Sequence, residues 1–332
     1  MKPQVTATPS NRRVLGSPTS RRQGVPQMRK VFAFLVVGSL LFAACAEDNP
    51  TIGGTGATAT GGTGATTPAT AADCAAANAD AFKNQGTLTI GTGNPAFPPW
   101  WEGGTSDGSE FEFNDPAKGE GYEGAVAAEV ATRMGFTFPD QVTFVPVSFN
   151  KSFAPGPKDF DFVLQQISYK PERDDAVDFS DSYYNVNQAL VSAEGSAVAD
   201  ATSIADLKDA KLGAPIGTTS LDVITEQIQP TQEPAVYDDL AQAVTDLQNG
   251  DIDGIVVDLP TAFFMSAVQI KHGVVVGQFG AESDEYFAMA FETGSPLVAC
   301  VNLALAEMKA DGTLDDIEQQ WLADKTNAPV LD

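Results

Sequence analysis

Short blocks of apolar and polar residues alternate between Gly86 and Leu322, and they predict strands and helices that follow one another in turn. Strands are indicated where β-branched and aromatic residues cluster between turn residues. The predicted strands are 87–92, 142–147, 160–164, 188–191, 211–214, 252–257 and 286–292. This alternation is typical of the α/β class, in which helices cover the faces of a mostly parallel sheet.

Helices are predicted between these strands from apolar periodicity and from the residues that begin and end helices. The pattern Ser203-x-x-Asp206 is typical of a helix start, and Gly135 and Gly312 are expected helix stops. The predicted helices are 125–134, 201–207, a helix from the turn 215–220 to 228, 239–248, 259–267, 297–310 and 315–322. The segment 149–157 holds two prolines and a glycine, so a regular helix is not expected there.

Residues 1–44 have the composition of an export signal. They contain seven Lys or Arg and no acid, and an apolar run of 14 residues ends at Ala44. Because that run is shorter than the roughly 20 residues of a membrane-spanning helix and Cys45 follows it, we expect a secretory signal peptide that ends in a lipobox, with Cys45 lipidated. Ordinary signal-peptidase cleavage after Ala44 is an alternative, and a start at Met28 would make 1–27 an upstream extension.

Residues 45–73 consist mostly of Gly, Thr and Ala. Such a segment has too little apolar surface to offset its ordering entropy, so we expect a disordered tether between the lipid and the folded part. The same composition suits the wall-spanning spacer of any surface lipoprotein. About 255 residues remain, which is enough for one large or two medium domains.

Charge and cysteine usage narrow the possible partners. The net charge is −25, and removal of the seven basic residues of the signal leaves about −32. A surface this acidic argues against nucleic acid or anionic lipid as a partner. If Cys45 is lipidated, Cys74 and Cys300 are left as an even pair in an oxidising environment, and we expect them to form a disulfide. Two free, buried cysteines are the alternative.

Candidate binding residues stand where predicted strands end. Arg173 follows the strand 160–164, and its planar guanidinium suits a carboxylate or a phosphate; a solvated arginine or one paired with its acidic neighbours is the alternative. The turn 215–220 offers backbone amides and hydroxyls to an anion, unless Thr218 or Thr219 only caps the following helix. Asp258 ends the strand 252–257, where its carboxylate suits an ammonium group or caps the next helix.

The run from Ser168 to Arg173 (SYKPER) and the run from Val177 to Tyr183 (VDFSDSY) resemble the S-I-T-x-x-R and V-D-F-S-x-x-Y segments of the extracytoplasmic solute-binding proteins, family 3. These are the receptor subunits of polar amino-acid ABC transporters, and the resemblance covers most of 86–322. It implies an α/β, two-lobed periplasmic-binding-protein type II fold with the ligand cleft between the lobes. The expected boundaries are 74–191 plus 278–332 for lobe 1 and 192–277 for lobe 2.

The resemblance also implies a binding set for an amino acid. Arg173 would pair with the ligand carboxylate, to which Ser168 and Thr219 would donate. Asp258 and a backbone carbonyl near Gln166 would hold the ammonium group, and aromatic residues would cover the apolar part. The full candidate set is Arg173, Ser168, Gln166, Thr219, Asp258, Phe97, Trp100 and Phe149.

Two departures from the family pattern bear on the ligand. Many relatives have an Asp where Gly93 and Asn94 stand, and the second Asp of the family's G-F-D-x-D-L-A segment is Ala125 here. Fewer acids disfavour a ligand with a cationic side chain. For the aromatic positions, packing in the core is the alternative to ligand contact, and at least one tryptophan is expected there.

The implied function is that of a monomeric, lipid-anchored receptor outside the cell membrane, which captures a polar amino acid and delivers it to an ABC permease. No cofactor, metal or catalytic residue is expected. The single histidine, His272, is predicted in an exposed segment, and no Ser-His or Cys-His pairing is evident. A dehydratase-like enzyme on the same fold and a sensor lipoprotein that presents its ligand to a kinase are the alternatives.

Overall fold

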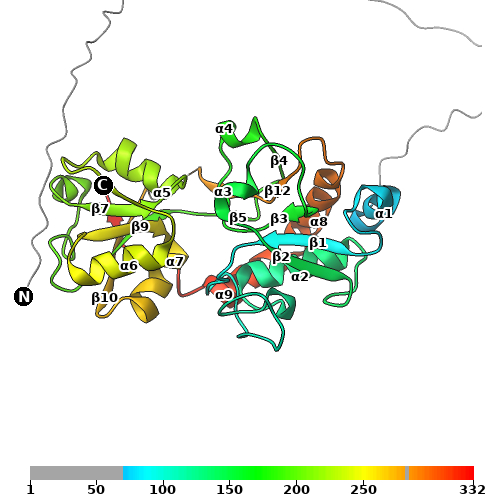
Figure 1. Cartoon of the computed structure of the whole chain (residues 1–332), viewed down its shortest axis with the longest axis horizontal. Helices are drawn as coiled ribbons and strands as arrows, with labels where there is room; N and C mark the ends of the chain where they lie inside the picture. The colour runs from blue at the N-terminus through cyan, green and yellow to red at the C-terminus, as the bar shows by residue number, and fades with distance from the viewer. Residues whose placement is uncertain (1–69, 281–283) are drawn as a thin grey trace, which may run out of the picture. The chain divides into compact units, whose positions relative to one another are not determined.

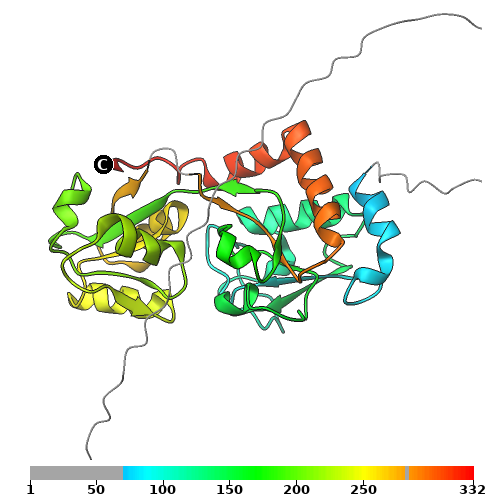
Figure 2. The same cartoon turned by 90° about the horizontal axis from the view of Figure 1, so that it is seen from above.

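Two separate β-sheets organise the chain in the computed structural model, which describes residues 70–280 and 284–332 (Figures 1 and 2). The predicted signal peptide, Cys45 and most of the predicted tether lie outside the described residues. The tether was expected to extend to residue 73, but Thr70 already caps helix α1 (Ala71–Ala77), because its side chain accepts a hydrogen bond from the Asp73 amide. We call the part built on each sheet a lobe.

The five-stranded sheet of the first lobe has the order β2-β1-β3-β12-β4. Its strands are β1 (Leu88–Thr92), β2 (Val142–Pro146), β3 (Phe162–Val163), β4 (Asp178–Phe179) and β12 (Ala290–Phe291). Strand β1 is parallel to β2 and β3, whereas β12 is antiparallel to β3 and β4. Helices α2 (Tyr122–Arg133), α8 (Leu297–Asp311) and α9 (Thr313–Leu322) contribute buried residues to one hydrophobic cluster with β1 and β2.

The six-stranded sheet of the second lobe has the order β13-β10-β6-β9-β7-β8. Its strands are β6 (Gln188–Ala193), β7 (Leu212–Pro215), β8 (Ala235–Tyr237), β9 (Gly254–Asp258), β10 (Gly273–Phe279) and β13 (Val330–Leu331). Strand β6 is antiparallel to β9 and β10, and β7 is parallel to β8 and β9.

Both faces of this second sheet are covered, which explains its continuous apolar strands. Ala189 and Val191 of β6 face one hydrophobic cluster with α6 (Leu240–Asn249) and α7 (Leu259–Phe264), whereas Leu190 between them faces a second cluster. The second cluster includes the 3₁₀ helix η3 (Ile204–Leu207) and the π-helix η4 (Val223–Ile228). Side chains of a strand alternate between the two faces, so one strand serves both clusters.

The lobe boundaries differ from those expected. Residues 188–191 and 278–279 were assigned to lobe 1, but β6 and β10 pair with each other in the sheet of the second lobe. Strand β13 near the chain end also pairs with β10, so the chain enters the second lobe a second time. An apolar strand has the same pattern in either sheet, and its partner is fixed only by tertiary pairing.

Shorter elements connect the two lobes or project from them. Strands β5 (Tyr184–Asn185) and β11 (Tyr286–Phe287) form a two-stranded antiparallel sheet of their own. The predicted strand 286–292 is therefore two short strands in different sheets. The remaining helices are α3 (Phe149–Ser152), α4 (Pro171–Asp174), α5 (Thr219–Asp222), η1 (Ala79–Ala81), η2 (Pro116–Lys118) and the π-helix η5 (Met265–Gln269).

The predicted disulfide is present. Cys74 of α1 and Cys300 of α8 are bonded, although 226 positions separate them in the sequence. The bond joins the start of the folded part to its longest helix within the first lobe. Within the described ranges, no helix combines the length and apolar character that crossing a bilayer requires.

Candidate ligand-binding site

A cavity of about 360 Å³ has walls from both lobes. The first lobe supplies the loop that follows β1, helix α3 and the end of β3, and the second lobe supplies the ends of β7 and β9 and the start of α6. Known small-molecule sites have volumes of roughly 300–1,000 Å³. The volume of this cavity falls within that range, so the cavity is large enough for an amino acid. The polar residues on its walls include Gln165, Gln166, Gln188, Thr218, Thr219, Ser220, Asp238, Asp239 and Asp258.

Asp258 lies on the cavity wall and also caps a helix. Its Oδ1 accepts a hydrogen bond from the backbone N–H of Thr261 at 2.9 Å, so the alternative of a helix cap is realised. Burial raises the pKa of Asp258 to about 6, a rise that hydrogen bonds from Thr261 oppose and the nearby Glu285 carboxylate reinforces. The residue is therefore mostly ionised at neutral pH and mostly protonated below pH 6.

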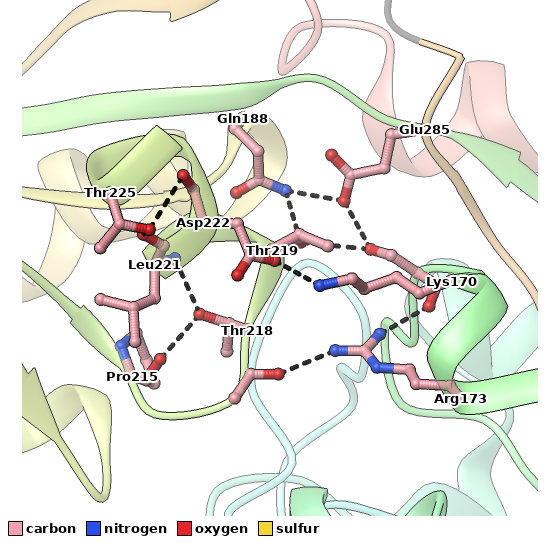
Figure 3. Close-up of polar contacts among 12 residues, drawn as sticks. Lys170, Arg173, Gln188, Pro215, Thr218, Thr219, Leu221, Asp222, Thr225 and Glu285 are labelled. Carbon is pink, nitrogen blue, oxygen red and sulfur yellow. Dashed lines mark hydrogen bonds and ion pairs between the residues drawn. The ribbon is translucent and has the colours of Figure 1, made fainter. Parts of the chain in front are cut away.

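Ser168 and Thr219, expected to donate to one ligand carboxylate, do come together. Figure 3 shows Thr219 close to Gln188. The Thr219 hydroxyl lies 3.4 Å from both the Ser168 Oγ and the Gln188 Nε2. Ser168 Oγ donates to the carboxylate of Glu285 at 2.5 Å, and Gln188 Nε2 donates to the same oxygen at 3.1 Å. Helix α5 is capped by Thr218, whose hydroxyl accepts from the amide of Leu221, so the Thr219 hydroxyl is not needed for the cap.

Arg173 is buried between the lobes rather than solvated. Its Nη1 donates to the carbonyl of Ser168 at 2.5 Å and its Nη2 to the carbonyl of Gly217 at 2.8 Å. The guanidinium lies over the rings of Phe153 and Phe149, with its central carbon 4.4 and 5.5 Å from their centres. Its hydrogen bonds therefore join the two lobes, and the expected alternatives of solvation or pairing with an acidic sequence neighbour are not what the structure contains.

The charge of Arg173 is maintained despite its burial. Desolvation lowers the pKa of the guanidinium to about 10, and the carboxylates of Asp222, Glu285 and Glu172 oppose that fall. The side chain thus stays cationic at neutral pH. Arg173 is not among the residues that line the cavity, but it contacts Phe149, which does, and the Gly217 carbonyl, which precedes the lining residues Thr218 and Thr219. Nearby, Lys170 pairs with Asp222 of the second lobe at 2.6 Å.

Phe97 and Phe149 line the cavity, but Trp100 does not. The prediction that Trp100 covers the ligand is corrected here, because its indole is 2% exposed and packs edge-on against three aromatic rings. Its Nε1 donates to the hydroxyl of Thr261 in the second lobe at 2.9 Å. Trp100 therefore belongs to the core and to the junction of the lobes, and Trp101 lines the cavity instead.

A buried carboxylate positions Gln166 on the cavity wall. Gln166 has a φ of 47°, a left-handed conformation that is costly for a residue with a side chain. Its backbone N–H donates to Glu123 at 2.7 Å, and its side-chain amide donates to the second oxygen of the same carboxylate. The Tyr183 hydroxyl also donates to Glu123. Burial raises the pKa of Glu123 to about 7, and these hydrogen bonds oppose the rise.

Sequence reasoning missed several residues of this site. Gln188 was placed in a strand, and Glu285 just before one, without a role. Glu123 lies two residues before Ala125, in the segment that resembles G-F-D-x-D-L-A, and no role was predicted for it. Each acts through a partner at least 30 positions away, such as Ser220 for Gln188 and Ser168 for Glu285, so no local pattern indicates it.

Other chemistry has little support among the described residues. No group of three or more His, Cys, Asp or Glu side chains there is arranged to hold a metal ion. His272 is exposed, as expected, and its Nδ1 lies 3.7 Å from the carboxylate of Glu194.

Comparisons with known proteins agree with this architecture. The model of the bacterial extracellular solute-binding proteins, family 3, matches residues 103–324. The L-cystine-binding protein TcyA of Bacillus subtilis (strain 168) is 29% identical over 250 residues, which are 73% of this chain and 84% of that protein.

Two solved structures are similar over most of their length. An ancestral arginine-binding protein bound to glutamine has a TM-score of 0.58 and 28% identity, and the match covers 72% of this chain and 98% of that one. The ancestral amino acid-binding protein AncCDT-1, a precursor of cyclohexadienyl dehydratase, has a TM-score of 0.57 and 27% identity, with 71% and 95% of the chains covered.

Proposed function

The chain belongs to the bacterial extracellular solute-binding proteins, family 3, and on that premise we propose that it captures a polar amino acid outside the cytoplasm and delivers it to an ABC permease. The named relatives support an amino-acid ligand, since one binds L-cystine and another was solved with glutamine.

The observation that carries the proposal is a cavity with walls from both lobes and the Asp258 carboxylate on one of them. An amino acid is a zwitterion, so it needs an anion at one end and donors or a cation at the other. We propose that Asp258 holds the ammonium group together with a backbone carbonyl near Gln166. The walls formed by Phe97 and Phe149 would cover the apolar part of the ligand.

At the other end of the ligand, we propose that Thr219 and Ser168 donate to its carboxylate and that Arg173 supplies the positive charge. Arg173 is within reach of this role because it is buried next to both residues and has five N–H groups, two of which are used by the carbonyls of Ser168 and Gly217. The groups come from different lobes, so a bound ligand would hold the lobes together and favour the closed arrangement.

A ligand screen tests this function. The domain from residue 70 onward is screened against each of the twenty amino acids. Its true ligand, at about 100 times the dissociation constant, should raise the unfolding free energy by about 2.7 kcal/mol. We expect Arg173→Ala to abolish that thermal shift, because the ligand carboxylate loses the buried positive charge that lies next to Ser168 and the Gly217–Thr219 turn.

Arg133→Ala is the matched control. It removes a guanidinium from the same lobe, where Arg133 pairs with Glu129 and Asp311 away from the cavity walls, and it should keep the shift. An Arg173→Ala protein that is folded by near-UV circular dichroism and shifts like wild type would exclude the role of Arg173. Absence of any shift in the wild type would contradict the receptor itself, and conversion of the added amino acid would favour the dehydratase-like alternative.

We propose that the receptor acts as a monomer. We also propose that a lipid on Cys45 anchors it, and the lipid anchor is tested in cells. The expected result is that a labelled fatty acid is incorporated into the wild type and that Cys45→Ser moves the protein from the membrane fraction to the medium. The reason is that the thiol is the only site for the thioether-linked lipid after a lipobox. An unlabelled, released wild-type protein would instead indicate ordinary cleavage after Ala44.

A further inference from the structure

The carboxylate of Glu285 is held by several donors from both lobes (Figure 3). One of its oxygens accepts from Ser168 Oγ of the first lobe at 2.5 Å and from Gln188 Nε2 of the second lobe at 3.1 Å. The hydroxyl of Thr219 lies 3.4 Å from each of these donors. Glu285 itself lies in the connection between β10 and β11, which joins the lobes.

These donors are built into the protein rather than gathered at its surface. Ser168 is 2% exposed and Gln188 is 3% exposed. The Ser220 hydroxyl donates to Gln188 Oε1 at 2.6 Å, which turns the Nε2 of that amide towards Glu285. Hydroxyl and amide donors that converge in a buried place on one carboxylate oxygen form a carboxylate subsite, and charge-assisted hydrogen bonds of this kind are among the strong ones.

We propose that Glu285 is an internal competitor for the carboxylate of the solute: its side chain occupies the donors of Ser168 and Gln188, beside the Thr219 hydroxyl, and a ligand carboxylate must displace it. The inference rests on the proposed function, in which the same hydroxyls donate to the ligand. Glu285 is half-buried, so part of its surface is already in contact with solvent, and its neighbour Asp284 is exposed.

Electrostatic repulsion makes the competition between Glu285 and the ligand carboxylate mutually exclusive. Two carboxylates cannot share these donors without repulsion, so the bound ligand and the seated Glu285 exclude each other. Glu285 also lies within electrostatic reach of both ends of the ligand site, because it stabilises the charged form of Arg173 and raises the pKa of Asp258. When only a fraction of the molecules has the subsite accessible, the apparent affinity falls by that fraction.

The test compares Glu285→Ala with Asp284→Ala, a matched control that removes the same charge one residue away. The probe is the amino acid with the largest wild-type thermal shift, and the dissociation constant is measured by isothermal titration calorimetry. We expect Glu285→Ala to bind about tenfold more tightly than wild type, which corresponds to about 1.4 kcal/mol, and Asp284→Ala to bind like wild type.

A second readout follows from the position of Asp258. Removal of Glu285 takes away one cause of its raised pKa, so the acidic midpoint of binding should move to lower pH in Glu285→Ala but not in Asp284→Ala. Equal or weaker binding by Glu285→Ala, with the wild type binding normally, overturns the inference and leaves the receptor function intact. If neither the wild type nor either variant binds, the inference and the receptor function are both overturned. If Glu285→Ala is the one protein of the three that binds, the result supports the inference and the receptor function.

Discussion

Asp258→Asn is expected to weaken amino-acid binding by on the order of 100-fold, because removal of one partner from a desolvated charge pair costs about 2–5 kcal/mol. Asparagine has the same shape, and it is as good a helix cap as aspartate. Its side-chain oxygen can still accept from the Thr261 amide, which Asp258 contacts at 2.9 Å, so α7 should keep its start. The loss would therefore be one of charge rather than of fold.

The same residue should make binding depend on pH. With a pKa of about 6, Asp258 gains its charge as the pH rises through that value, so affinity should rise between pH 5 and 7 and then level off. Titration calorimetry from pH 5 to 8 checks this, and Asp258→Asn should lack the rise. A wild-type affinity that falls with rising pH, or an Asn variant that binds like wild type, would exclude Asp258 as the ammonium partner.

Stability should show the opposite trend at this residue. The ordinary pKa of the group is 3.8 and burial raises it to about 6, so the folded state binds the proton more tightly than the unfolded chain. The stabilising contribution is fully present below about pH 3.8 and is lost as the pH rises through 6. At neutral pH the charged Asp258 therefore lowers the unfolding free energy of the unliganded protein. A carboxylate in this condition is available to pair with an ammonium group, as a binding role requires.

Loss of the Cys74–Cys300 bond is expected to have the largest effect on stability. The bond closes a loop between residues 226 positions apart, and the chain-entropy relation for such a loop gives about 5 kcal/mol. At roughly 2–4 °C per kcal/mol for a domain of this size, Cys74→Ser/Cys300→Ser should melt roughly 10–20 °C lower. Differential scanning calorimetry measures the change, and chemically reduced wild type should match the double variant.

Binding should survive this change. The bond lies between α1 and α8 of the first lobe, and neither helix contributes to the walls of the cavity. The amino-acid affinity of the folded double variant should therefore equal that of wild type at a temperature well below its melting point. An unchanged melting temperature would show that the unfolded chain gains nothing from release of the loop.

Much of this fold could be predicted from local pattern. The pattern of apolar residues indicated strands β1, β2, β3, β6, β7 and β9, but not β4, β8, β10 or β13. Asp258 was placed at the end of its strand because parallel strands present such residues at one edge. The disulfide followed from the count of cysteines in an exported chain. No regular helix was expected in the segment 149–157, but α3 forms one helical turn there, Phe149–Ser152, before the two prolines.

What failed depended on partners distant in the sequence. Trp100 stands in a loop where an aromatic ring could cover a ligand or enter the core. Its burial is decided by Tyr122, Tyr184 and Phe287, which only the tertiary fold brings together. The assignment of 188–191 to the wrong lobe has the same origin, because the hydrogen bonds that place β6 come from β9 and β10.

The paths of the two chain ends have a practical consequence. The described chain begins in α1, which is bonded to α8 of the first lobe, and it finishes just after β13, which is the edge strand of the second lobe. A donor fluorophore fused before residue 70 and an acceptor fused after Asp332 would thus be attached to different lobes. Under the proposed function, a bound ligand favours the closed arrangement of the lobes, so energy transfer between the two fluorophores would report ligand binding.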